Sequence, residues 1–474
     1  MSHLQRITPM RLKRITIQNF KCFQEPQNLD LGKITLLTGA NSSGKSSVLY
    51  GMLGPLQSDE FPFTFSVNGK YVNMGDFREI VFNHAADRDI SLGFVFENGS
   101  INRIESVWTD DKPQHLPILK HLHAELDYFT LLMTRQADAS YRLSYQYDPD
   151  RDPLAQAIAS DRLINIFNRL SSSIETAVGG IMKSVQAVHG IDSQQPMDLQ
   201  RMWQASFEAK TVDNQRVEDI QTLKAYVLQL DNLRIRQIIE SLTAVFREFD
   251  DKINYISSFR LHPDRTYLEK TKADLKIEKF GEGYLDQIIY WETQKAPEFK
   301  RLIQVMKQLG LLHGIKSRRL DGGRFEFMVR TGSKGAFSAL SDVGFGISQF
   351  LPVLVADLQL PDDSTLVVSQ PEIHLHPSTQ SRYGAYLVEE VNRTDKRYVI
   401  ETHSEYLINR IRLEIVKGNL KPEDLQVYFT EQTPAGGQIH TIRFARNGQV
   451  HDAPDDFFKT YMMDVMEIAL HAES

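Results

Sequence analysis

The residues of this chain with the clearest chemistry lie between positions 39 and 47. Residues 39–46 read Gly-Ala-Asn-Ser-Ser-Gly-Lys-Ser and fit the phosphate-loop pattern G-x-x-x-x-G-K-[ST] without a mismatch. In such a loop, backbone N–H groups converge on phosphate oxygens, and the N-terminus of the following helix adds partial positive charge. We expect Lys45 to reach the β- and γ-phosphates of ATP and the Ser46 hydroxyl to ligate Mg²⁺. The predicted nucleotide-binding residues of the loop are Gly39, Asn41, Ser42, Ser43, Gly44, Lys45, Ser46 and Ser47.

The segments on either side of this loop have the patterns that a phosphate loop requires. Residues 33–38 form an apolar run that is typical of a buried strand, and residues 46–56 are predicted to be helical. Residues 11–18 alternate and are rich in β-branched side chains, which predicts another strand. A strand before the loop and a helix after it favour a phosphate loop over an ordinary Gly/Ser turn.

Three segments in the second half of the chain also carry glycines, acids or histidines. Residues 340–349 read Leu-Ser-Asp-Val-Gly-Phe-Gly-Ile-Ser-Gln and are similar to an ABC-type signature. Residues 367–377 read Val-Val-Ser-Gln-Pro-Glu-Ile-His-Leu-His-Pro and resemble a Walker B and D-loop segment. Residues 400–405 read Ile-Glu-Thr-His-Ser-Glu and resemble the segment of a switch histidine. Residues 15–23 resemble the opening strand of RecF, SMC and OLD-type ATPases.

Taken in order, these segments resemble the ABC/OLD-like ATPases of the AAA-15/AAA-21 group, and especially the DUF3696 branch. Residues 255–265 and 444–458 also fit that branch, and the resemblance covers residues 1–108 and 255–460. It implies an α/β fold, in which an ABC-type P-loop ATPase core carries an N-terminal β-meander lobe and a helical insertion. The signature residues that it implies for ATP are Ser341, Gly344 and Gly346, which would act on nucleotide held by a second copy of the chain.

The pattern of the intervening residues sets the expected boundaries. Residues 64–108 alternate, with Asn-Gly at 68–69 and 98–99, which predicts a β-meander. Residues 154–250 show helical spacing. We therefore expect an N-terminal ATPase part at 1–110, a helical insertion at 111–254 and a C-terminal ATPase part at 255–474. The apolar helical faces are Leu163, Ile166, Phe167, Leu170 and Ile174, and Ile235, Ile238, Ile239, Leu242, Phe246 and Phe249. A hairpin is expected at residues 321–323, with alternating strands and helices after it.

The Walker B segment departs from the family pattern, because Ser369 and Gln370 stand where acids are usual. Neither side chain is a general base, although Gln370 could orient water. Three interpretations remain open. Hydrolysis is slow and ATP mainly joins subunits, or Glu372 or Glu401 substitutes for the missing acid, or Gln370 is a Glu-to-Gln replacement that traps ATP. Gln is common at this position in the DUF3696 branch, which favours a native residue.

Glu401 and His403 follow an apolar strand, and ligands in α/β sheets bind at the carboxyl ends of strands. The candidate catalytic residues are therefore Gln370, Glu372, Glu401 and the switch histidine His403. Structural alternatives are that Glu401 is an N-terminal acid of the next helix and that Glu372 caps the His-Leu-His-Pro turn. The glutamine of a Q-loop is not evident, and Gln57, Asn83 and His84 are weak candidates.

Composition limits the class of protein. Lys and Arg number 54 and Asp and Glu number 61, so the net charge is −7, which disfavours general polyanion binding. A single cysteine excludes a disulfide framework. The sequence has no apolar run of about 18 residues and no signal-peptide pattern, so we expect a cytoplasmic protein without a membrane segment. Lys316, Arg318, Arg319 and Arg324 form a local basic patch that is more often a solvated face than a nucleic-acid site.

The resemblance also implies a function. Members of this group often act as the ATPase subunit of prokaryotic anti-phage or abortive-infection systems, such as the PARIS-type and Septu-type systems. We therefore expect a slow ATP hydrolase with ATP and Mg²⁺, which forms a homodimer or higher oligomer and holds a separately encoded nuclease or toxin effector. A phage protein would be the trigger. The alternative is a RecF- or SMC-like ATPase of DNA repair or recombination.

Overall fold

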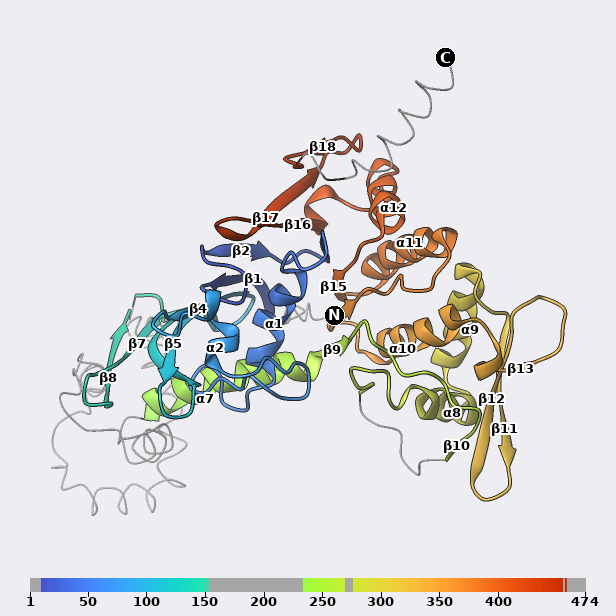
Figure 1. Cartoon of the computed structure of the whole chain (residues 1–474), viewed down its shortest axis with the longest axis horizontal. Coiled ribbons are helices and arrows are strands. Elements are labelled where there is room, and N and C mark those ends of the chain that lie inside the picture. The colour runs from blue at the N-terminus through green and yellow to red at the C-terminus, as the bar shows by residue number, and fades with distance from the viewer. Residues whose placement is uncertain (1–9, 149, 153–232, 269–275, 455–456, 458–474) are drawn as a thin grey trace, which may run out of the picture.

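The computed structural model describes residues 10–148, 150–152, 233–268, 276–454 and 457 (Figure 1). The described residues form a mixed α/β fold with three sheets. The expected helical face at residues 163–174 lies outside the described residues. Within the described part of the chain, no helix has both the length and the apolar character needed to cross a membrane.

The central sheet is mainly parallel and has seven strands, in the order β18-β17-β16-β3-β15-β14-β9. The five strands from β16 to β9 are parallel to one another, and β17 and β18 are antiparallel additions at one edge. The strand bounds are β3 Ile34–Gly39, β9 Ile253–Ile256, β14 Thr365–Ser369, β15 Arg397–Glu401, β16 Leu425–Thr433, β17 Gly436–Phe444 and β18 Val450–His451. The inner strands are buried along nearly their whole length, which explains their continuous apolar runs.

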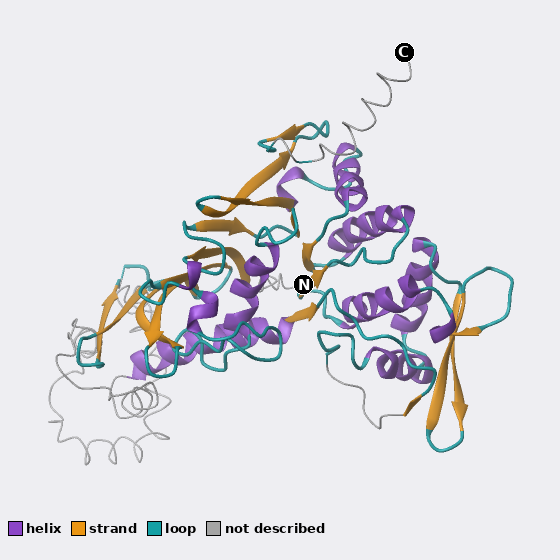
Figure 2. Ribbon diagram, in the orientation of Figure 1, coloured by secondary structure: helices purple, strands orange, loops and turns teal. Residues whose placement is uncertain are grey.

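Alternate residues of the central sheet contribute to two hydrophobic cores. Leu37 and Val367 join the core shared with the N-terminal lobe, whereas Leu36 and Val368 join the core on the other face. Figure 2 shows the C-terminal helices gathered on the side of the sheet away from the meander lobe. The helices are α1 Lys45–Leu56, α7 Leu233–Lys252, α8 Tyr284–Gln294, α9 Pro297–Leu309, α10 Phe345–Gln359, α11 Pro377–Arg393 and α12 Glu405–Val416.

The N-terminal lobe is an antiparallel sheet in the order β2-β1-β4-β5-β6-β7-β8. The Asn-Gly pair at 98–99 turns the hairpin between β4 and β5, as predicted, whereas residues 68–73 form only an isolated bridge. The short helices α2 Phe77–Ile80 and η1 Phe82–His84 precede β4. The strands are β1 Arg11–Gln18, β2 Gln27–Asp30, β4 Ile90–Glu97, β5 Ile101–Asp111, β6 Leu116–Leu126, β7 Phe129–Arg135 and β8 Tyr141–Tyr147.

The expected start of a helical insertion at residue 111 is wrong, because residues 116–147 form three further strands of the meander. The register between β5 and β6 shifts at Val107 and Trp108, so β6 contains a bulge. The buried residues of β6, Leu119, Leu122 and Ala124, are therefore spaced by three and then by two. A bulge interrupts the period of two by which a strand is recognised, and a spacing of three imitates a helix.

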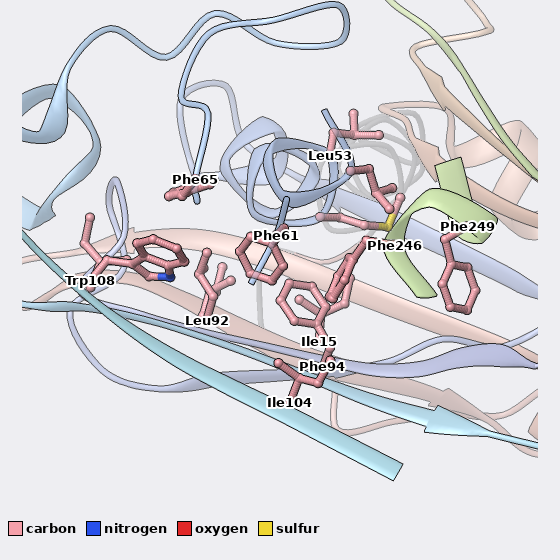
Figure 3. Close-up of a cluster of buried hydrophobic side chains, with 14 of the residues drawn as sticks. Ile15, Leu53, Phe61, Phe65, Leu92, Phe94, Ile104, Trp108, Phe246 and Phe249 are labelled. Atoms are coloured by element: carbon pink, nitrogen blue, oxygen red, sulfur yellow. The ribbon is translucent and has the colours of Figure 1, made fainter. Parts of the chain in front are cut away.

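Helix α7 is the described helix of the expected insertion, and Ile238, Ile239, Leu242, Phe246 and Phe249 of its predicted apolar face join the core with the meander sheet and α1. Figure 3 shows Phe246 among side chains of the lobe, with its ring centroid 4.6 Å from that of Phe61 and 5.4 Å from that of Phe94. Trp108 lies 5.7 Å from Phe61 between centroids, and its indole N–H donates to the Ser106 hydroxyl. The helix thus leads the chain from the lobe directly into β9 of the central sheet.

The third sheet is a small antiparallel unit that lies beside α8 and α9 in Figure 1. The predicted hairpin at residues 321–323 joins β11 to β12 and is confirmed. The strands are β10 Tyr267–Leu268, β11 Gly314–Leu320, β12 Arg324–Arg330 and β13 Ser338–Ala339. The short helices η2 Leu340–Asp342 and η3 Pro422–Asp424 complete the described elements.

Candidate functional site

The candidate site lies at the carboxyl edge of the parallel strands. In the register of the sheet, Ser369 at the end of β14 is paired with Glu401 at the end of β15, and Glu401 is paired with Leu37 of β3. The phosphate loop leaves β3 two residues later and enters α1 at Lys45. Three segments that are far apart in sequence therefore meet at one edge, as expected for ligand sites in parallel sheets.

Two glycines of the loop are required by its backbone. Gly39 has φ of 133°, and a Cβ there would lie 2.1 Å from the carbonyl oxygen of Thr430. Gly44 has φ of 107°, and a Cβ there would lie 2.5 Å from Sγ of Cys22. Both residues thus combine a left-handed conformation with a close neighbour, which only glycine accommodates. Ser42 also has positive φ, so the loop curls tightly before α1.

Lys45 is 4% exposed and lies at the first residue of α1. Its Nζ donates hydrogen bonds to the carbonyl oxygens of Gly39, at 3.2 Å, and Ala40, at 2.6 Å. Burial lowers the pKa of Lys45, while the charges of Glu401 and Glu372 oppose that shift. The ammonium group is thus held inside the curl of the loop, where phosphate would be bound.

Thr430 of β16 is a residue of the site that sequence reasoning missed. Its hydroxyl lies 2.5 Å from Oγ of Ser43 and 3.2 Å from the carbonyl oxygen of Thr38. It is fully buried. Thr430 therefore fixes the loop against the neighbouring strand, and a single threonine inside an apolar strand gave no sequence signal for this role.

Glu401 joins the phosphate loop to the Walker B strand. Its Oε1 accepts a hydrogen bond from the Ser46 hydroxyl at 2.9 Å, and its Oε2 accepts one from the Ser369 hydroxyl at 3.0 Å. The hydroxyl of Tyr255 lies 3.3 Å from Oγ of Ser369. The alternative role of Glu401 as an N-terminal acid of α12 is wrong, because that helix begins at residue 405 and its N-cap is Ser404.

Gln370 occupies a constrained turn just after β14. Its φ is 48°, and its backbone N–H donates to the carbonyl oxygen of Glu401 at 2.6 Å. Arg260, a second residue that sequence reasoning missed, donates through Nη2 to the carbonyl oxygens of Ser369 at 2.8 Å and Gln370 at 3.1 Å. Arg260 is 4% exposed, and this burial lowers its pKa to about 10. The buried guanidinium of Arg260 thus stabilises the turn at Gln370 through its backbone carbonyl oxygens.

Glu372 holds the segment of the switch histidine. Its Oε1 accepts a hydrogen bond from the backbone N–H of His403 at 2.6 Å. In the His-Leu-His-Pro turn, the backbone carbonyl of Glu372 accepts from the N–H of Leu375 at 2.9 Å, whereas the N-cap of α11 is His376. Burial raises the pKa of Glu372, and the hydrogen bond from His403 opposes this shift. Burial and then the charge of Lys45 lower the pKa of the His403 imidazole.

The signature segment lies at the N-terminus of α10. Ser341 is in η2 and donates to Oδ1 of Asp342 at 3.2 Å, and Arg265 pairs with the other oxygen of that carboxylate. Gly344 is the exposed N-cap of α10. A Cβ at Gly346 would lie 2.6 Å from the carbonyl oxygen of His374, so this glycine allows α10 to approach the D-loop. The signature thus packs on the Walker B segment and leaves Gly344 open to solvent.

Of the weak Q-loop candidates, Gln57 has a structural role. Its side chain donates to the carbonyl oxygen of Ser66 and accepts from the backbone N–H groups of Tyr71 and Val72. Gln57 follows the C-terminal end of α1, about 18 Å along the helix from Lys45 at 1.5 Å per residue. Asn83 and His84 lie in η1 with positive φ, and the His84 ring bonds to the carbonyl oxygen of Arg78.

The donor groups at the loop fit a magnesium nucleotide. Mg²⁺ prefers oxygen ligands, and the Ser46 hydroxyl and the Glu401 carboxylate offer these side by side. The loop, Lys45 and the N-terminus of α1 offer positive potential for phosphates. Among the described residues, no group of three or more His, Cys, Asp or Glu side chains is placed to hold a metal. The two histidines of the segment at residues 367–377 have structural contacts: the ring of His374 packs on Phe345, and His376 caps α11.

Comparison with known proteins gives a family. The fold is similar to an SMC head domain from Pyrococcus furiosus, which was solved with an extended coiled coil and bound to the C-terminal domain of ScpA. The two chains share 10% sequence identity with a TM-score of 0.39, and the match covers 98% of this chain and 100% of that one. The SMC head domain from Thermotoga maritima gives 10% identity and a TM-score of 0.34, with 90% and 98% covered. No curated protein matches the sequence. Residues 10–408 match the family AAA_15, described as an AAA ATPase domain, and the chain belongs to this family.

Proposed function

We propose that the chain is an ATP-binding ATPase whose working state is the long-lived ATP–Mg²⁺ complex rather than rapid turnover. Membership of an AAA ATPase family supports nucleotide binding. The observation that carries the slow turnover is the end of β14, where Ser369 and Gln370 provide no carboxylate. Glu372, the nearest acid along the chain, uses one oxygen to hold the backbone of His403.

Each residue of the site then has a specific task. Lys45 and the N–H groups of the loop bind the β- and γ-phosphates, and Ser46 holds Mg²⁺, which neutralises charge on the phosphate oxygens. His403 faces the γ-phosphate from the end of β15. Gln370 orients water without removing its proton, because an amide is not a base at neutral pH. Hydrolysis therefore lacks efficient general-base assistance, which is typically worth about 10²–10⁴-fold.

We further propose that ATP is bound between two copies of the chain. The N-terminus of α10 carries partial positive charge, and Gly344 and Phe345 at that end are exposed. Ser341, Gly344 and Gly346 of one copy would contact the γ-phosphate held by the phosphate loop of the other. The complete site then requires both copies, so ATP acts as the ligand that joins them.

The cellular role that we propose is that of the ATPase subunit of a prokaryotic anti-phage system. The chain would hold a separately encoded nuclease or toxin, and a phage protein would change its nucleotide state. The resemblance to the DUF3696 branch supports this role. A long-lived ATP complex suits it, because a subunit that holds an effector in check needs a stable state rather than a high rate.

The test combines binding, turnover and partner association. The purified chain should bind a fluorescent ATP analogue in the presence of Mg²⁺ and hydrolyse ATP slowly in a single-turnover assay. The product of the neighbouring effector gene should co-purify with the chain when ATP is present. Fast hydrolysis that depends on added DNA, without association with that product, would instead support the RecF- or SMC-like alternative.

A further inference from the structure

We propose that Glu401 supplies the carboxylate of the Mg²⁺ site, so that β15 provides the acid that is missing from β14. This inference rests on the proposed ATP–Mg²⁺ function and assigns one residue within it. The alternatives that the sequence leaves open, Glu372 and Glu401, are thereby given different tasks. Glu401 is a ligand of the metal, and Glu372 binds the backbone of the switch-histidine segment.

The geometry places the Glu401 carboxylate against the residue that is expected to ligate Mg²⁺. Its Oε1 lies 2.9 Å from the hydroxyl oxygen of Ser46. Ser46 is the second residue of α1, at the end where phosphate groups are attracted. A cation bound by Ser46 and phosphate oxygens would therefore lie next to this carboxylate, which is the type of ligand that Mg²⁺ prefers.

The position of Glu401 is equivalent to that of the missing acid, displaced by one strand. Ser369 and Glu401 are paired neighbours at the ends of β14 and β15. Oγ of Ser369 lies 3.0 Å from Oε2 of Glu401, so the small side chain on β14 leaves room for the longer one on β15. An acid on either strand end would thus direct its charge to the same region beside Ser46.

The charge of Glu401 also favours a cation at this place. Its side chain is buried, with 5% of the residue exposed, and its hydrogen-bond partners Ser46 and Ser369 are both neutral hydroxyls. Within the described part of the chain, no salt bridge to Glu401 is formed, and Lys45 attracts it at longer range. A buried carboxylate is costly unless it is paired with a cation or ligates a metal.

Ser369 and Tyr255 are positioning residues for this carboxylate. Ser369 donates to Oε2, and the Tyr255 hydroxyl lies 3.3 Å from Oγ of Ser369. Tyr255 is buried on β9, so the chain of hydrogen bonds crosses three neighbouring strands. The arrangement fixes the rotamer of Glu401 and leaves Oε1 directed at Ser46.

The test measures how strongly Mg²⁺ increases ATP affinity, with no hydrolysis involved. The dissociation constant of a fluorescent ATP analogue is measured in excess EDTA and in excess Mg²⁺ for the unmodified chain, Glu401→Gln and Glu372→Gln. We expect Mg²⁺ to tighten binding by about 10-fold or more in the unmodified chain and in Glu372→Gln, the lower end of what loss of even an outer-shell partner of a metal ligand costs. In Glu401→Gln this increase should be lost, while affinity in EDTA is unchanged or higher.

Two further measurements separate the metal role from a structural one. Glu401→Gln should keep the thermal midpoint of the unmodified chain to within a few degrees, since an amide oxygen still accepts from Ser46. The double variant Glu401→Gln with Ser369→Asp returns a carboxylate to β14 and should restore the effect of Mg²⁺. An equal loss of affinity with and without Mg²⁺ in Glu401→Gln would overturn the inference while the proposed function stands. No ATP binding by the unmodified chain would overturn the proposed function and this inference with it.

Discussion

The hydroxyl of Ser46 donates to Oε1 of Glu401 at 2.9 Å, although the two residues are 355 positions apart in the chain. This bond connects the phosphate loop, which follows β3, to the end of β15, the strand that pairs directly with β3. The site is therefore complete only when the segments on both sides of residues 153–232 have joined one sheet. Pairing of β3 with β15 therefore brings the two halves of the candidate site together.

The first prediction concerns the ammonium group of the phosphate loop. Lys45→Ala should weaken ATP binding by at least about 10-fold, because a hydrogen bond to a charged group is worth about 1.5–3 kcal/mol. The fold should persist, since among the described residues the hydrogen bonds of Nζ go to the carbonyl oxygens of Gly39 and Ala40 in the loop itself. Binding of a fluorescent ATP analogue measures the effect, and Lys417→Ala at the end of α12 is the control. Unchanged affinity in Lys45→Ala would contradict the assignment of the loop.

Much of the fold follows from the sequence because the parallel strands are buried on both faces. These strands contain short, mostly apolar runs at residues 34–37 and 398–400, and such runs between helical segments predict an α/β sheet. The three strands at 116–147 could not be predicted, because the bulge in β6 changes the spacing of its buried residues. Alternation of polar and apolar residues is read from neighbouring positions along β6. The bulge, in contrast, is set by the pairing of β6 with β5, which the local sequence does not show.

The candidate site could be predicted only in part, for a similar reason. The loop pattern identifies Lys45 and Ser46 because their spacing along the chain is short. Glu401 was one of two candidate acids, and the choice depends on which strands are neighbours. Arg260 acts through backbone carbonyl oxygens, and Thr430 acts through hydrogen bonds of its hydroxyl to Ser43 and to the backbone of Thr38. Neither kind of contact leaves a pattern in the sequence. A basic residue beside an apolar strand was the available signal for Arg260.

The second prediction concerns the site shared by two copies. Lys45→Ala and Ser341→Arg each disable a different half of the proposed sandwich, so neither variant alone should form a stable ATP-dependent dimer. A mixture of the two should regain one intact site per dimer, because one copy supplies the loop and the other the signature. Light scattering with ATP and Mg²⁺ measures the mass. A strictly monomeric unmodified chain under these conditions would contradict the shared site.

The third prediction concerns the core between α7 and the meander lobe. Phe246 is 3% exposed and contacts the rings of Phe61, Phe94 and Phe96. Phe246→Ala should lower the free energy of unfolding by about 3–5 kcal/mol, as is typical for a buried phenylalanine. The control is Phe259→Ala, because Phe259 is 71% exposed and its truncation leaves no cavity. Thermal unfolding should separate the two variants clearly, and equal midpoints would show that α7 is not part of this core.

The fourth prediction uses the buried carboxylate of Glu390. It has no exposed surface and accepts from Arg301 and Arg393, each at 2.6 Å. Burial raises the pKa of Glu390, but the hydrogen bonds and charges of Arg393 and Arg301 outweigh it, so the net pKa is lowered. A carboxylate with a lowered pKa stabilises the folded state above its unfolded value of about 4.5, and this contribution disappears as the pH falls.

Glu390→Gln should therefore lower the free energy of unfolding by about 2 kcal/mol near neutral pH, on the scale of hydrogen bonds to charged groups. The difference from the unmodified chain should shrink below about pH 4.5. Glu389→Gln is the matched control, because Glu389 pairs with Arg301 at 2.9 Å while its side chain is 48% exposed. An exposed pair is worth less than about 1 kcal/mol. A difference for Glu390→Gln that stays constant with pH would contradict this account.

The last prediction concerns turnover. With Ser369 and Gln370 at the end of β14, we expect intrinsic hydrolysis well below about 1 s⁻¹, the lower end of typical enzyme rates. Gln370→Glu should raise the single-turnover rate, because it adds a base where the attacking water is oriented. The backbone of the turn should accept this change, since Arg260 binds the carbonyl oxygens of Ser369 and Gln370 whatever the side chain.

Glu401→Gln should lower any residual rate if Glu401 holds the metal, and Glu372→Gln should do so only through the position of His403. Rates measured over a range of Mg²⁺ concentrations distinguish the two. The residual rate of Glu401→Gln should depend little on the Mg²⁺ concentration, because its metal site is lost. Glu372→Gln should keep the Mg²⁺ dependence of the unmodified chain at a lower rate, because its histidine segment is displaced. Rapid steady-state hydrolysis by the unmodified chain, insensitive to substitution at Glu372 and at Glu401, would show that water activation at this edge of the sheet depends on a different group.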